Sequence, residues 1–183
     1  MSETDKTPEG FNEVSPENLV WRPYEAFAKD WMALAAGSEA GFNAMTVAWG
    51  QVGSLWGKPD GGIAHPVATV YVRPQRYTNE FMKKQSLFTL SHFAQEQRKA
   101  LGILGSRSGR SGDKVADSGL TPVFWGDTVF FKEATMVIVC RKIYHTQITA
   151  EGFADDAIMK ANYPERDFHE VYIGEILKMW LHD

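Results

Sequence analysis

Short runs of apolar, β-branched and aromatic residues recur along the chain, separated by breaks that contain glycine, proline and serine. Residues 66–72 hold such residues without a single charge, which predicts a buried strand. The same pattern predicts strands at residues 31–36, which stop at Gly37, and at residues 42–50 and 87–91. Sheet is therefore expected to dominate the first half of the chain.

The second half carries the longest apolar stretch. Residues 134–149 are rich in Val, Ile and Tyr, and they exceed the length of an ordinary strand, as expected of a strand that bends around a barrel. Residues 168–181 predict a closing strand. The short runs 122–125 and 128–131 flank Gly126-Asp127, which suits a turn between them.

Helical segments are few and short. Residues 78–85 are expected to form a helix with Thr78 as its N-cap. Further helices are expected at residues 24–29, at residues 94–104 ending at Gly105, and at residues 151–161. Many strands with few helices favour a mainly β fold, a β-barrel with peripheral helices, over a doubly wound α/β sheet.

The chain divides into a tail and one domain. Residues 1–13 are polar and include Pro8 and Gly10, which predicts a flexible N-terminal tail, and residues 14–183 are expected to form a single domain. Residues 51–62 are glycine-rich and are predicted to be a loop. Because this loop carries Leu55 and Trp56, we expect it to fold over a neighbouring surface.

Composition and charge limit the classes of function that are possible for this chain. The chain is 44% hydrophobic and 23% charged, as is usual for a globular protein, and its net charge of −4 disfavours general nucleic-acid binding. The one cysteine, Cys140, lies in an apolar run and is expected to be a buried, inert thiol. Residues 1–6 lack the basic and apolar regions of a signal peptide, so none is expected, and no run is long enough to span a membrane; a cytoplasmic location is therefore expected. The five histidines show no metal-ligand spacing.

A segment rich in glycine, serine and cations occupies residues 105–114. Its glycines allow backbone N–H groups to converge, and its Ser, Arg and Lys side chains add donors that suit an anion. It is not a P-loop, because Asp113 separates Gly112 from Lys114 and Val115 stands at the hydroxyl position. No G-x-G-x-x-G motif occurs in the chain. Taken alone, the segment could equally be a flexible linker.

A second anion-suited cluster spans residues 73–78. Arg73 precedes Pro74 and is thereby biased to extended geometry at the end of the strand, whereas Arg76 and Thr78 stand where a helix begins. An ordinary surface arginine pair beside a helix cap would look the same. Two such clusters together favour a phosphate-bearing ligand.

Five segments together resemble the flavin reductase-like, FMN-binding split-barrel family, with flavoredoxin-type members the most similar. The resemblance extends over roughly residues 21–183. The order and spacing of the segments carry it. Ser111 and Gly112 separate the fourth segment from Asp113, which departs from the family pattern. The segments are 42–50 (FNAMTVAWG), 53–56 (GSLW), 71–78 (YVRPQRYT), 108–110 (SGR) with Lys114, and 169–175 (HEVYIGE).

The resemblance implies a homodimer of six-stranded split barrels with FMN in a groove at or near the subunit interface. Strand residues and the loop after them would contact the flavin rings, and two cationic groups would hold the phosphate or ribityl chain. His169 would approach the reactive face of the flavin or the hydride donor. The implied ring contacts are Asn43, Ala44, Met45, Thr46, Trp49, Ser54 and Trp56, and the implied phosphate contacts are Arg73, Arg76, Thr78, Ser108, Gly109, Arg110 and Lys114.

Several of these residues could instead have purely structural roles. Trp49, Trp56 and Tyr71 could line an apolar slot for a flat ring or pack in the core, and Asn43 could cap a turn. Three functions follow: an NAD(P)H-dependent flavin reductase that passes electrons to a small-molecule or protein acceptor, a flavoredoxin-like electron carrier reduced by a protein partner, or a split barrel that binds haem or has lost its flavin site.

Overall fold

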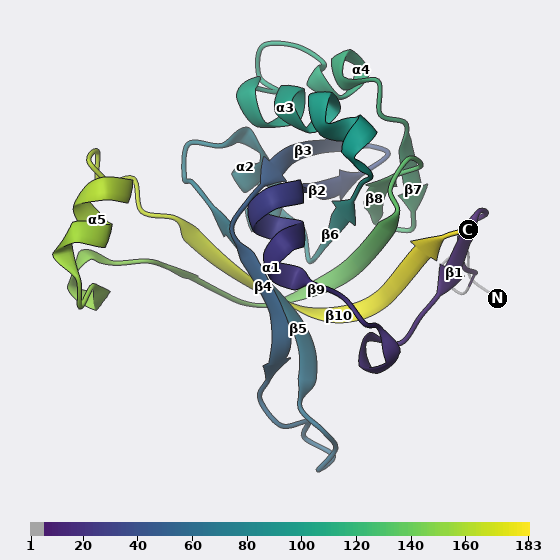
Figure 1. The fold of residues 1–183 in the computed structure, drawn as a ribbon, viewed down its shortest axis with the longest axis horizontal. Coiled ribbons are helices and arrows are strands. Elements are labelled where there is room, and N and C mark those ends of the chain that lie inside the picture. The colour runs from purple at the N-terminus through teal and green to yellow at the C-terminus, as the bar shows by residue number, and fades with distance from the viewer. Residues whose placement is uncertain (1–5) are drawn as a thin grey trace.

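Strands that are distant in the sequence pair into one sheet of eight, in the order β3-β2-β6-β9-β10-β5-β4, with β1 added to β10 (Figure 1). The computed structural model describes residues 6–183. The expected mainly β barrel with peripheral helices is confirmed. The strands are β1 (Phe11–Glu13), β2 (Met32–Ser38), β3 (Gly41–Val47), β4 (Gly50–Leu55), β5 (His65–Val72), β6 (Leu87–His92), β9 (Met136–Gln147) and β10 (Glu170–His182).

A separate antiparallel pair, β7 (Pro122–Trp125) and β8 (Thr128–Phe131), confirms the expected turn at Gly126. Short helices surround the sheet, and none in residues 6–183 is both long and apolar enough to cross a membrane. The helices are α1 (Pro23–Glu25), the π-helical turn η3 (Ala26–Asp30), α2 (Tyr77–Lys84), α3 (Arg98–Ser106), α4 (Lys114–Ser118) and α5 (Asp156–Asn162), with 3-10 turns η2 (Pro16–Asn18), η4 (Gln95–Gln97) and η5 (Ala150–Gly152).

Strand β2 is buried on both faces, which explains its continuous apolar sequence. Leu34 packs into one core cluster with Val70 and Ile138, while its neighbour Ala35 packs into a second cluster beneath β7 and β8 that includes Trp180. A strand covered on both faces gains from apolar side chains at every position. The two clusters therefore place β2, β6 and β9 at the centre of the fold.

The long strand β9 bends as the sequence predicts, together with its partner β10. Their pairing shifts register between Ile173 and Gly174 and again between Ile176 and Lys178. Such bulges bend a strand and increase its twist. Gly174 is required here, because an added Cβ would lie 2.5 Å from the Phe88 ring. The bend lets β10 pair with β9 along one edge and with β5 along the other.

Two predicted boundaries around the glycine-rich stretch are wrong. Residues 51–62 were expected to be a loop, but β4 occupies the first half of that range and pairs with β5 in a hairpin that projects from the body (Figure 1). Glycines are tolerated in β4 because it is an edge strand with little packing on it. The strand predicted at 42–50 ends at Val47, and Gly50 begins β4, where an added Cβ would lie 2.3 Å from the Phe27 ring.

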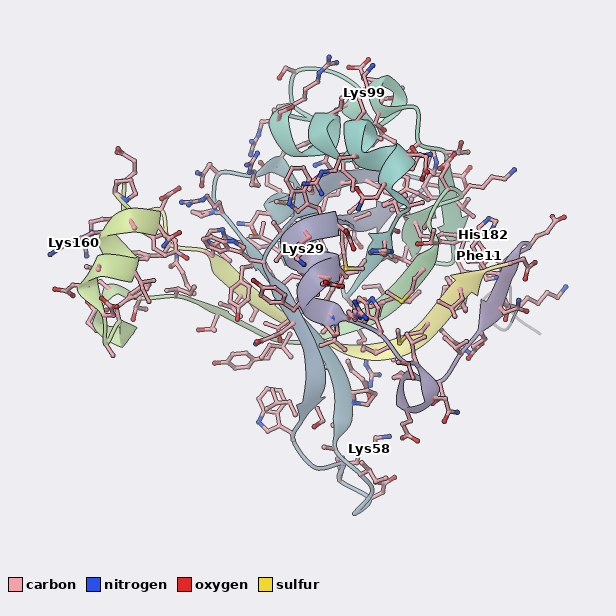
Figure 2. The ribbon with its side chains drawn as sticks, viewed as in Figure 1. Phe11, Lys29, Lys58, Lys99, Lys160 and His182 are labelled. Carbon is pink, nitrogen blue, oxygen red and sulfur yellow. The ribbon has the colours of Figure 1, made fainter. Side chains whose placement is uncertain are left out.

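The N-terminal tail is shorter than predicted. Residues 11–13 form β1, which pairs with the end of β10. Phe11 is buried and its ring lies 5.5 Å from that of Phe130 and 4.9 Å from that of His182, next to which it is labelled in Figure 2. The apolar Phe11 side chain explains why this polar segment attaches to the sheet. Residues 1–5 of the predicted tail lie outside the described part of the chain.

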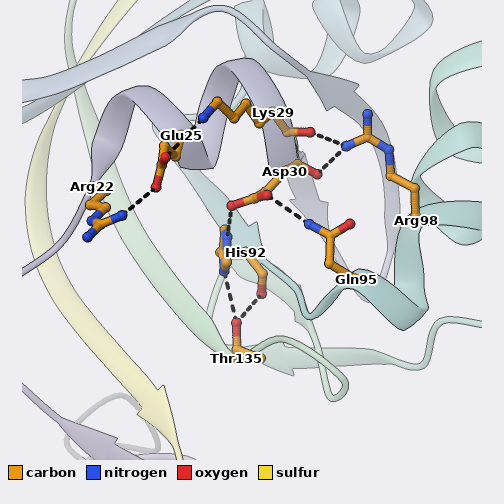
Figure 3. Close-up of polar contacts among 8 residues, drawn as sticks. All are labelled: Arg22, Glu25, Lys29, Asp30, His92, Gln95, Arg98 and Thr135. Atoms are coloured by element: carbon orange, nitrogen blue, oxygen red, sulfur yellow. Dashed lines mark hydrogen bonds and ion pairs between the residues drawn. The ribbon is translucent and has the colours of Figure 1, made fainter.

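A polar cluster fastens the end of η3 to the strands and to α3 (Figure 3). The Arg98 guanidinium donates to the carbonyl of Asp30 at 2.8 Å and to that of Lys29, and it lies 3.2 Å from the Trp31 ring centroid. Trp31 has a φ of 67°, a left-handed conformation that is strained for a residue with a side chain. Arg98 therefore stabilises the strained connection from η3 into β2.

Candidate functional site

Two adjoining hollows lie where the ends of β3 and β5 meet α2 and α3. The first, the aromatic hollow, has a volume of about 200 Å³. The second, the cationic hollow, has a volume of about 290 Å³ and shares Met45 and Arg76 with the first. The aromatic hollow is lined by Met45, Thr46, Val47, Ala48, Trp49, Tyr71, Arg73, Arg76 and His169, and the cationic hollow by Met45, Gln75, Arg76, Tyr77, Thr78, Ser106, Arg107, Ser108 and Lys114.

The prediction that Thr78 caps α2 is wrong. Arg76 holds the N-cap position without a side-chain bond, and Thr78 lies inside the first turn. The buried Thr78 hydroxyl instead accepts a hydrogen bond from Asn43 Nδ2 at 2.6 Å. A threonine in the first turn of the helix joins α2 to β3, because its side chain faces the sheet rather than the helix end. This bond joins the floor of the cationic hollow, which Thr78 helps to line, to β3.

The glycine-rich segment approaches this floor closely. A Cβ added at Gly109 would lie 2.2 Å from Asn43 Oδ1 and 3.0 Å from the Tyr77 ring, so the position requires glycine. Thr46 lines the aromatic hollow, and its hydroxyl donates to the Leu101 carbonyl of α3. Strand β3 therefore holds both α2 and α3, the two helices between which the cationic hollow opens.

Lys114 is the most deeply buried cation of the cationic hollow, with 5% exposure. Its ammonium group donates to the carbonyls of Leu104 at 3.0 Å and Arg107 at 3.2 Å. Burial, with Arg76 nearby, lowers the pKa of Lys114 to about 8. An ammonium group has three N–H donors, so one remains for a ligand. The Asp113 carboxylate caps α4 by accepting from the Val115 and Ala116 amides, which fixes the start of the helix that carries Lys114.

The two arginines after β5 differ in their partners. Arg76 Nη1 donates to the Gly105 carbonyl at 2.9 Å, and the side chain lines both hollows. Arg73 forms an ion pair with Asp167 and donates to the Asn162 carbonyl at 2.9 Å. Hydrogen bonds from Gln75 and Arg73 hold the pKa of Asp167 below its usual value. Much of the Arg73 charge is therefore already balanced, whereas Arg76 keeps its full charge for a ligand.

Arg110 does not line the cationic hollow. Its guanidinium donates to the Gln75 carbonyl at 3.1 Å, pairs with Glu80, and lies 4.8 Å from the Tyr77 ring centroid. Arg107 lines the hollow instead, with Ser108 beside it, and pairs with Asp117. Sequence reasoning missed Arg107, although it lies in the same glycine- and serine-rich run. The sequence analysis named Arg110 as the arginine of this run at the site, whereas Arg107 is the one that lines the cationic hollow.

His169 lies at the far wall of the aromatic hollow, 7% exposed. Its ring centroid lies 4.7 Å from that of Trp49, and its Nδ1 lies 2.9 Å from the Tyr163 hydroxyl oxygen. Burial, assisted by the positive charge of Arg73, lowers the pKa of His169 to about 4. The imidazole is therefore neutral at neutral pH. Sequence reasoning missed Tyr163, which no spacing rule connects to His169.

Ser54 and Trp56, both implied as ring contacts, lie apart from both hollows. Ser54 pairs with Pro66 on the projecting hairpin. Trp56 follows at the end of β4 with a φ of 54°, and its ring centroid lies 5.8 Å from that of Tyr144 on the outer side of the sheet. Within one chain, therefore, the structure does not bring Ser54 and Trp56 to the site. Tyr71, for which an apolar slot and core packing both stood open, lines the aromatic hollow together with Trp49.

Comparison with known proteins places the chain in a family. Residues 27–183 match the model of the flavin reductase like domain, and the chain belongs to this family. No curated protein matches it. The fold is similar to that of the FMN-binding domain of a flavin reductases-like enzyme from Shewanella baltica OS155, with a TM-score of 0.64 and 18% identity over 94% of this chain and 77% of that one.

Two flavoredoxins share the fold as well. The flavoredoxin from Methanosarcina acetivorans has a TM-score of 0.60 and 18% identity over 94% of this chain and 76% of that one. The flavoredoxin of Desulfovibrio vulgaris (Miyazaki F) has a TM-score of 0.60 and 23% identity over 84% of this chain and 69% of that one. The split barrel expected from the sequence is thus confirmed as the fold.

Proposed function

We propose that the protein is an FMN-binding oxidoreductase that takes electrons from NAD(P)H and passes them to an acceptor. The observation that carries the proposal is the continuity of the two hollows: Arg76 and Met45 line both, so one ligand can extend from an aromatic surface to a buried cation. Family membership supports the same function. FMN has the matching parts, a planar ring system at one end and a phosphate dianion at the other.

The residues present fit FMN. Lys114 and Arg76 offer charged donors to the phosphate, and charge-assisted bonds of this kind are the strongest that a side chain makes. Trp49 and Tyr71 offer ring surfaces to the isoalloxazine. Bound FMN would supply the redox chemistry, accepting a hydride from the nicotinamide and delivering electrons to the acceptor.

The chain's own residues would bind, orient and shield. The Asn43–Thr78 bond and the close approach of Gly109 keep the floor of the site rigid, so that the phosphate donors stay in place. Trp49 covers His169 from solvent, and the neutral imidazole can exchange a hydrogen bond with a ligand in the aromatic hollow without adding charge there.

A visible absorption spectrum of the purified protein, followed by anaerobic mixing with NADH and with NADPH, tests this proposal. We expect a flavin spectrum that one of the two nucleotides bleaches at a catalytic rate. A protein that takes up no FMN would contradict the proposal. Bound FMN that neither nucleotide bleaches would favour a flavoredoxin-like carrier reduced by a protein partner, which the similarity to two flavoredoxins supports.

We also propose a homodimer. The outer side of the sheet, formed by β4, β5, β10 and β9, bears large apolar side chains: Trp56 is 50% exposed, Tyr144 46% and Leu177 41%. Apolar groups gathered in this way are typical of an interface between protein chains. Light scattering should give twice the chain mass, and Tyr144→Glu should shift the measured mass towards that of the monomer.

The cytoplasmic location expected from the sequence remains a prediction.

A further inference from the structure

A third hollow adjoins the aromatic hollow on the side away from the cations. This apolar hollow has a volume of about 490 Å³, within the range typical of small-molecule sites. Phe27 and Ala28 of η3 form one wall, and the chain from Ile148 to Tyr163 forms the other. The two walls come from segments far apart in the sequence, because η3 directly follows α1 and the second wall includes α5; both helices are labelled in Figure 1.

The walls of the apolar hollow carry no carboxylate, amine or guanidinium. Its polar groups are the hydroxyls of three tyrosines and the side chain of Asn162. Two of these hydroxyls already have partners, since that of Tyr71 lies 3.3 Å from Gln51 Nε2 and that of Tyr163 lies 2.9 Å from His169 Nδ1. A ligand therefore meets mainly carbon atoms, with a few hydroxyl groups that could orient it.

The arginine beside the Tyr163 wall of this hollow is not available to a ligand. Arg73 lies 5.3 Å from the Tyr163 ring centroid, but its guanidinium is paired with Asp167 and with the Asn162 carbonyl. A phosphate or carboxylate placed in the apolar hollow would lose its hydration without gaining a charged partner, which is strongly unfavourable. The chemistry of the walls thus selects an uncharged ligand.

The apolar hollow and the aromatic hollow have residues in common. Ala48, Trp49 and Tyr71 line both of them. A molecule in the apolar hollow would therefore lie against the same rings as a cofactor in the aromatic hollow. This contact with the proposed cofactor site distinguishes the apolar hollow from an ordinary surface groove.

We propose that the apolar hollow binds the second substrate of the enzyme, a neutral ring compound that accepts electrons. The assignment to electron transfer rests on the proposed function, whereas the binding itself does not. A quinone of this class would take up the hydride that NAD(P)H gives up and one proton from solvent, which yields the hydroquinone and NAD(P)+.

Calorimetric titration with 1-naphthol tests the binding directly. The FMN-loaded protein should bind 1-naphthol at one site per chain, and 1-naphthyl phosphate at least tenfold more weakly. Ala28→Trp, which fills the hollow, and Ile158→Asp, which places a charge on its wall, should each weaken 1-naphthol binding at least tenfold. Both positions are exposed, so neither variant should impair folding. Ile63→Asp is the matched control, because Ile63 is 79% exposed and lies on the hairpin outside the hollow.

The outcomes separate this inference from the proposed function. If the protein takes up no FMN, the titration is made on the protein alone with excess inorganic phosphate to occupy the cationic hollow. If the two variants weaken 1-naphthol binding under these conditions, the apolar hollow is supported as the binding site even though the flavin assignment has failed. No binding of 1-naphthol, equal binding of its phosphate ester, or unchanged binding by both variants would overturn the inference. So would a dimer whose partner chain fills the hollow and excludes the probe.

Discussion

The Tyr163 hydroxyl oxygen lies 2.9 Å from Nδ1 of His169, and both side chains are buried. Because the pKa of His169 is lowered to about 4, the ring is neutral near pH 7 and one of its nitrogens must accept. A phenol that donates to Nδ1 leaves the ring proton on Nε2. Tyr163 is thus a positioning residue that sets which hydrogen bond His169 can make.

Tyr163→Phe should remove this control. We expect the nitrogen NMR signals of the His169 ring to change from a single Nε2–H tautomer to a mixture, and stability to fall by about 0.5–1.5 kcal/mol because a buried hydrogen bond is lost. Tyr24→Phe, at a side chain that is 77% exposed, is the matched control for stability. An unchanged tautomer in Tyr163→Phe would show that the phenol is not the donor.

His169 should make the protein less stable in acid. Its pKa is lowered from 6.5 to about 4, so below pH 6.5 the unfolded chain binds a proton that the folded chain does not. The free energy of unfolding therefore falls as pH falls through this window, by about 3 kcal/mol in all from this group. Urea unfolding of His169→Gln should show a shallower fall than the parent protein. His182→Gln, at an exposed position, should match the parent.

Lys114 should make the preference for FMN over riboflavin depend on pH. Its pKa is lowered to about 8, so the amine is charged below this pH and loses its charge above it. Only FMN carries a phosphate, so the ratio of the two affinities should fall as pH rises above about 8 and stay flat in Lys114→Met. Lys142→Met is a matched control, because Lys142 also donates to two backbone carbonyls but lies outside both hollows. Equal pH dependence in all three proteins would exclude Lys114 from the phosphate site.

Arg98 should stabilise the wall of the apolar hollow. Arg98→Met removes the donors to the Lys29 and Asp30 carbonyls, and chemical denaturation should show a loss of about 1.5–3 kcal/mol. Arg22→Met should cost far less, since the Arg22 side chain is 82% exposed and pairs with Glu25, three residues further along the chain. A loss no larger than in Arg22→Met would mean that the Trp31 conformation does not depend on Arg98.

The sequence predicted the buried strands well because their signal is local. Residues 66–72 and 87–91 became β5 and β6 with shifts of one residue at an end, since uncharged β-branched runs suit only a covered strand. Strand β4 was missed because its stability comes from pairing with β5 rather than from its own residues. Its partner β5 is the next strand along the chain, but the glycine and polar residues among 51–54 show no local strand pattern that would reveal the pairing.

The candidate site was predicted as a set of clusters rather than as individual contacts. Arg76 and Lys114 line one hollow as expected, because a strand end, a helix start and a capped helix fix them. The Arg110 side chain pairs with Glu80 outside the cationic hollow, and Arg107 lines that hollow instead. In a segment this rich in glycine, many backbone paths are open, so an arginine's direction depends on partners from other elements.

The most direct measurement is the affinity of FMN and of riboflavin for the parent protein, Arg76→Ala and Arg110→Ala. Arg76→Ala should weaken FMN by on the order of 1.5–3 kcal/mol, roughly tenfold to hundredfold, and leave riboflavin nearly unchanged. Arg110→Ala should change neither ligand by more than about twofold, because its guanidinium is held by Glu80 and the Gln75 carbonyl. If Arg76→Ala weakens both ligands equally, the cationic hollow does not hold the phosphate, and the central claim fails.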